Sequence, residues 1–83
     1  MTSVDEIFER MHREPASVDF ADLLKVCGEF FGKPRHAETS HAIFKTPLLD
    51  NPCVSIQNDQ GKAKAYSVIQ VISAVYRLRD GIL

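Results

Sequence analysis

Five side chains in this 83-residue sequence could carry proton-transfer or metal chemistry, namely His12, His36, His41, Cys27 and Cys53. An imidazole exchanges its proton near neutral pH, so a histidine is the natural candidate for a general acid or base. The two cysteines lie 26 positions apart with no secretion signal before them, which favours small apolar core residues over a disulfide. The histidine and cysteine spacings match neither HxxxH nor CxxC, so we expect no metal ion and no other cofactor.

Charge is distributed unevenly along the chain, although the formal net charge is only −1. Residues 1–29 include seven acidic and three basic residues, whereas residues 30–83 include four acidic and seven basic ones. A basic C-terminal part can contact phosphate, yet so small an excess does not by itself indicate nucleic-acid binding. The sequence shows neither an apolar run of membrane-spanning length nor a secretion signal, so we expect a cytoplasmic protein.

These residues must be positioned by regular elements, and three stretches have the apolar periodicity of amphipathic helices: about 2–13, 19–31 and 67–80. Ser3 and Glu6 have capping-box spacing at the start of the first helix.

The other two helices also carry end signals. Asp19 is expected to cap the second helix, which Gly32 ends. Ser67 and Gln70 have capping-box spacing at the third, where Tyr66 is expected to pack against Val71.

Between the second and third helices the apolar period changes to two, which is typical of strands. We expect strands at residues 35–38, 40–46 and 53–57, a turn at 46–52 and a loop at 58–62. Along the middle strand, the alternation directs Ala42 and Phe44 to one face and His41, Ile43 and Lys45 to the other.

The resulting order is helix, helix, three strands, helix. It predicts one α+β domain over residues 1–83, in which helices pack on one face of a three-stranded antiparallel sheet. Residues 1–17 would form an N-terminal helix and connector, and residues 18–80 an α-β-β-β-α core. His41 would then lie on the open face of the sheet.

Three short motifs follow one another in the second half of the chain: Ser40-His41-Ala42-Ile43-Phe44-Lys45, then Val54-Ser55-Ile56-Gln57-Asn58, then Gly61-Lys62-Ala63-Lys64-Ala65-Tyr66. Their order and composition resemble the HicA family of toxins from bacterial toxin–antitoxin systems. The resemblance covers about residues 19–78. It implies a double-stranded-RNA-binding-domain-like fold and a metal-independent endoribonuclease that cleaves mRNA.

The resemblance implies that His41 is the catalytic residue, acting as general acid or base on the 2′-hydroxyl or the leaving oxygen of RNA. A single histidine of this kind predicts a slow enzyme. Its implied partners are mRNA and a HicB-like antitoxin protein that covers the His41 face. The residues expected to bind RNA are Lys33, Arg35, Ser40, Lys45, Lys62 and Lys64.

Two departures from the family pattern leave other functions open. Glu38 and Thr39 stand where the family has the glycine before Ser-His, and Ala65 stands in place of a proline. A carboxylate at this point repels phosphate. The alternatives are a non-catalytic RNA-binding module and a protein-interaction module of the same fold.

Overall fold

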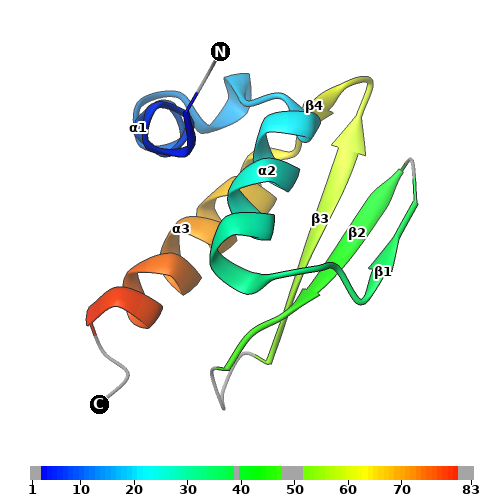
Figure 1. Cartoon of the computed structure of the whole chain (residues 1–83). Coiled ribbons are helices and arrows are strands. Elements are labelled where there is room, and N and C mark those ends of the chain that lie inside the picture. The colour runs from blue at the N-terminus through cyan, green and yellow to red at the C-terminus, as the bar shows by residue number, and fades with distance from the viewer. Residues whose placement is uncertain (1–2, 39, 48–51, 81–83) are drawn as a thin grey trace.

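A computed structural model describes residues 3–38, 40–47 and 52–80, as an α+β arrangement in which the helices gather on one side of an antiparallel sheet (Figure 1). The sheet order is β1-β2-β3-β4. No helix in these ranges is long and apolar enough to cross a membrane. The elements are α1 (Val4–Arg13), the 3₁₀ turn η1 (Pro15–Ser17), α2 (Phe20–Phe31), β1 (His36–Ala37), β2 (His41–Lys45), β3 (Cys53–Asp59), β4 (Lys62–Ala63) and α3 (Ala65–Asp80).

The N-terminal helix α1 begins with the predicted capping box. The Glu6 backbone N–H donates to Ser3 Oγ at 3.2 Å, and the Ser3 N–H donates to Glu6 Oε1 at 3.0 Å. Two of the first helix donors are therefore satisfied locally. Ile7 and Met11, one turn apart, are buried against α2 and α3, so α1 is part of the core.

The start of α2 is confirmed at Asp19, but the predicted capping hydrogen bond is absent. The Asp19 carboxylate instead accepts a hydrogen bond from Lys62 Nζ at 2.8 Å. This pair holds the pKa of the Asp19 carboxyl below its ordinary value, because the bond and the lysine charge favour the carboxylate. The Asp19 side chain therefore pairs with a cation 43 residues away and forms no hydrogen bond with the start of its own helix.

The middle strand β2 has the predicted two-faced character. Ala42 and Phe44 are buried, whereas His41 and Ile43 are partly exposed and Lys45 is exposed. The strand pairs with β1 on one side and β3 on the other. The predicted turn at 46–52 is closed by the Thr46 N–H donating to the Pro52 carbonyl at 2.8 Å, and its residues 48–51 lie outside the described ranges.

The predicted loop at 58–62 is wrong, because β3 continues to Asp59 and turns back into a fourth short strand, β4. Gln60 and Gly61 have positive φ values of 55° and 93°, as the tight turn of a two-residue hairpin requires. Gln60 lacks the usual asparagine or glycine signal for this conformation, and the hairpin was therefore missed.

Helix α3 begins at Ala65, two residues before the predicted start, because the Lys64 carbonyl accepts from the Ser67 and Val68 N–H groups. The predicted Ser67 capping box is therefore wrong: Ser67 is fully buried, and within the described residues its Oγ has no hydrogen-bond partner. Tyr66, expected to precede this helix and pack back against Val71, is instead its second residue and is 56% exposed.

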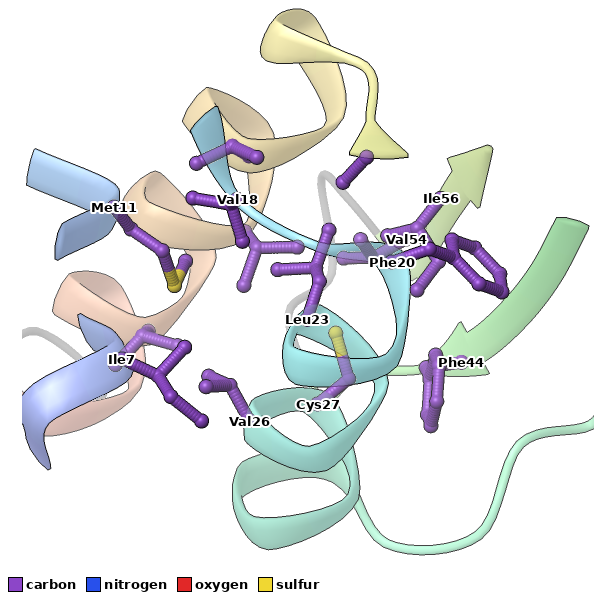
Figure 2. Close-up of a cluster of buried hydrophobic side chains, with 14 of the residues drawn as sticks. Ile7, Met11, Val18, Phe20, Leu23, Val26, Cys27, Phe44, Val54 and Ile56 are labelled. Carbon is purple, nitrogen blue, oxygen red and sulfur yellow. The ribbon is translucent and has the colours of Figure 1, made fainter. Parts of the chain in front are cut away.

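The core lies between the helices and the inner face of the sheet (Figure 2). Leu23 and Cys27 of α2 belong to the same buried cluster as Phe44, Val54 and Ile56 of the strands. Burial raises the pKa of the Cys27 thiol to about 12, so this cysteine is an apolar filler as predicted.

The second cysteine does not fit the same prediction. Cys53 is exposed at the start of β3, opposite Lys45, and both cysteines are free thiols. Its position in the outward-facing register of the strand explains the difference from Cys27.

Candidate functional site

The outer face of the sheet presents His41, whose side chain is 34% exposed. The alternation of β2 places this side chain opposite the buried Ala42 and Phe44, as predicted. His41 is the first residue of β2, so it lies at the end of the sheet where the β1–β2 hairpin turns. Its partner on β3 is Gln57. A solute can therefore reach the imidazole from the open side of the sheet.

Two further side chains converge on His41 from β1 and the residue after it. The His36 Nε2 and His41 Nδ1 atoms lie 3.5 Å and 3.4 Å from the Glu38 carboxylate. The two imidazole rings are 5.4 Å apart between centroids. Together, His36, Glu38 and His41 form what we call the hairpin cluster.

The register of the β1–β2 hairpin explains the cluster. The Glu38 N–H donates to the His41 carbonyl at 2.8 Å, which places Glu38 opposite His41. His36 precedes Glu38 by two residues and pairs with Ile43, so all three side chains share the outer face. Only residue 39 separates the predicted strands 35–38 and 40–46, and so short a connection requires a tight antiparallel hairpin. Applying the register of such a hairpin to the sequence could have predicted the cluster.

The described partners of the His41 ring both lie at Nδ1. They are the Glu38 carboxylate and Ser40 Oγ, the latter at 3.5 Å. A carboxylate beside one ring nitrogen orients an imidazole and compensates the charge that it gains on protonation. The Nε2 atom is then the one that can exchange a proton with a substrate.

Two of the residues expected to bind RNA, Lys64 and Arg35, lie next to the ends of strands near His41. The Lys64 N–H donates to the Gln57 carbonyl at 3.2 Å, and Gln57 pairs with His41, so the three form a row across the sheet. With strands about 4.8 Å apart, the Lys64 backbone lies about 10 Å from that of His41. Arg35 donates its N–H to the Ile43 carbonyl at 2.7 Å, two residues along β2 from His41.

The other expected basic residues lie farther away or are engaged elsewhere. Lys45 lies at the opposite end of β2, about 13 Å from His41 along the strand. Lys33 precedes β1 by three residues, and the strand predicted to begin at Arg35 begins one residue later, at His36. Lys62 forms the ion pair with Asp19, which offsets its charge.

His12 is a residue that sequence reasoning left without a role. Its Nε2 accepts a hydrogen bond from the Tyr76 hydroxyl, and its Nδ1 donates to the Phe8 carbonyl, each at 2.8 Å. Both ring nitrogens are thus engaged, the Phe8 bond within α1 and the Tyr76 bond joining α1 to α3. His12 and Tyr76 lie 64 residues apart, and no local signal in the sequence predicts their contact.

Comparisons of this chain with protein-family models, with curated proteins and with solved structures find no match. The residues around His41, and the resemblance of their sequence pattern to the HicA family, are therefore what a functional proposal rests on.

Proposed function

We propose that this chain is a HicA-like toxin with a double-stranded-RNA-binding-domain-like fold, an endoribonuclease that cleaves mRNA with His41 as its general acid or base. The observation that carries the proposal is the placement of His41. It is accessible on the outer face of the sheet, with a carboxylate 3.4 Å from Nδ1. This arrangement suits a proton-transfer residue better than a packing residue.

The reaction would use the nucleophile that RNA itself supplies. His41 Nε2 takes the proton from a 2′-hydroxyl, the 2′-oxygen forms a bond to phosphorus, and the bond from phosphorus to the 5′-oxygen breaks. The products are a 2′,3′-cyclic phosphate and a 5′-hydroxyl, and the leaving oxygen takes a proton from an acid. His36 offers the nearest second imidazole for that step, since its ring is 5.4 Å from that of His41.

Binding of the RNA would rest on the basic residues around this face. Lys64 is exposed one strand beyond Gln57, and the exposed Tyr66 follows it at the start of α3. Cations grip phosphates, and an exposed aromatic ring can stack on a base. The same surface would receive an antitoxin of the HicB type, whose acidic residues would speed association.

A second function is favoured by the charges at the site. Glu38 places a carboxylate between the two histidines, and Asp19 neutralises Lys62. Both features lower the attraction for phosphate. A protein-interaction module, or an RNA-binding module without catalysis, is therefore the alternative proposal.

The test is inducible expression in a bacterial host of the wild type, His41→Ala and the matched control His12→Gln. We expect growth arrest and loss of intact mRNA with the wild type and the control, and neither with His41→Ala. RNA binding by purified His41→Ala should persist. If all three chains are soluble and folded and none degrades mRNA, the nuclease proposal fails and the module remains.

A further inference from the structure

The hairpin cluster has the composition of a metal-ligand set. One ring nitrogen each from His36 and His41 and a carboxylate oxygen of Glu38 lie within 4.8 Å of one another. We propose that these three side chains bind a divalent first-row transition-metal ion, with Zn²⁺ as the test case. This site is absent from the sequence prediction, which expected no metal.

The spacing of the donor atoms is close to what such an ion needs. In a tetrahedral site with bonds of 2.0–2.1 Å, neighbouring ligand atoms lie about 3.3 Å apart. The separations from the Glu38 carboxylate to the two imidazoles are 3.5 Å and 3.4 Å. The ligand atoms of the two histidines lie within 4.8 Å of each other, so they need to approach by at most about 1.5 Å to reach that spacing.

The backbone holds these ligands in register. The Glu38 N–H bond to the His41 carbonyl and the Arg35 N–H bond to the Ile43 carbonyl, at 2.8 Å and 2.7 Å, brace the hairpin on both sides of His36. Ligands carried on paired strands lose less freedom on binding than ligands on a loop. The His36 and Glu38 side chains are each 53% exposed, so an ion and its remaining water ligands have access.

The donor types select the class of ion. Two imidazoles and one carboxylate suit Zn²⁺, Co²⁺, Ni²⁺ and Cu²⁺, whereas Mg²⁺ and Ca²⁺ prefer oxygen ligands. The cysteines offer little competition in the folded chain. Cys27 is buried with its pKa raised to about 12, and Cys53 lies at the far end of β2 and β3, beside Lys45.

Binding at the cluster does not depend on the ribonuclease proposal, although one consequence does. An ion held by His41 would take the imidazole out of proton transfer. If the chain is a ribonuclease of the proposed kind, Zn²⁺ would therefore inhibit it, which makes the cluster a regulatory site.

The experiment is a titration of the purified full chain with Zn²⁺ against a chromophoric chelator, in a Cys53→Ser background that removes the exposed thiol. The variants are His36→Gln, Glu38→Gln and His41→Gln, with His12→Gln as the matched control. We expect one ion per chain in the parent and the control, and affinity at least about tenfold weaker in each cluster variant.

Equal affinity in the parent and in the His36→Gln and His41→Gln variants would overturn the proposal, as would the absence of stoichiometric binding in the parent. A second measurement guards against misfolded variants. Zn²⁺ should raise the thermal midpoint of the parent and of His12→Gln but not that of His36→Gln, with matching circular dichroism spectra before the metal is added. Neither measurement uses RNA, so failure of nuclease activity leaves this test intact.

Discussion

The two histidines at His12 and His41 show how differently the two sides of this molecule use the same side chain. On the helical side, both ring nitrogens of His12 have partners, in Tyr76 and Phe8. On the outer face of the sheet, the described partners of His41 are at Nδ1 alone. An imidazole with both nitrogens hydrogen-bonded to the protein has a structural role. An imidazole with one accessible nitrogen can exchange protons or bind an ion.

The sharpest test of this contrast is RNA cleavage by purified protein. Loss of a general acid or base costs about 10²–10⁴-fold in rate, so His41→Ala should cleave RNA at least about a hundredfold more slowly than the wild type. His12→Gln should keep most of the activity. A His12 variant as slow as the His41 variant at equal folded concentration would remove the distinction between the two rings.

A second test compares the two faces of the sheet by stability. Phe44 is 1% exposed in the core, and replacing such a phenylalanine by alanine costs about 3–5 kcal/mol in the free energy of unfolding. Its neighbour Ile43 faces outward, so Ile43→Ala should cost much less. Urea denaturation measures both, and equal losses would contradict the assignment of faces.

Breaking the hydrogen bond between Tyr76 and His12 should have a smaller effect on stability. Tyr76→Phe removes the hydroxyl that bonds His12 but keeps the ring packed against Phe8. A single hydrogen bond of this kind contributes about 0.5–1.5 kcal/mol. Thermal or urea unfolding should show a loss in this range, and RNA cleavage should stay at the wild-type rate.

The smallest expected effect concerns the pair between Asp19 and Lys62. Because the folded-state pKa of Asp19 lies below its ordinary value of 3.8, the stabilisation is present above that value. It is lost as the pH falls through the lower folded pKa. Unfolding midpoints of the wild type and Asp19→Asn should therefore differ slightly at pH 6 and converge toward pH 2, and a difference that grew on acidification would contradict the pairing.

The elements that were predictable are those whose signals lie within one or two turns of chain. The Ser3–Glu6 capping box, the two-faced strand around Phe44 and the end of α2 at Gly32 all follow from spacings of a few residues. The hairpin at Gln60 and Gly61 was missed, because positive φ at a glutamine has no reliable sequence signal.

The sequence by itself determined which residues of α1 and β2 face the core and which face solvent, because periodicity expresses burial directly. Only the tertiary structure decided which outward-facing groups meet. Lys62 pairs with Asp19 across 43 residues, and Tyr76 reaches His12 across 64, since helix and sheet packing bring these positions together. The cluster of His36, Glu38 and His41 needed the register of one hairpin, which turns three ordinary polar residues into neighbours.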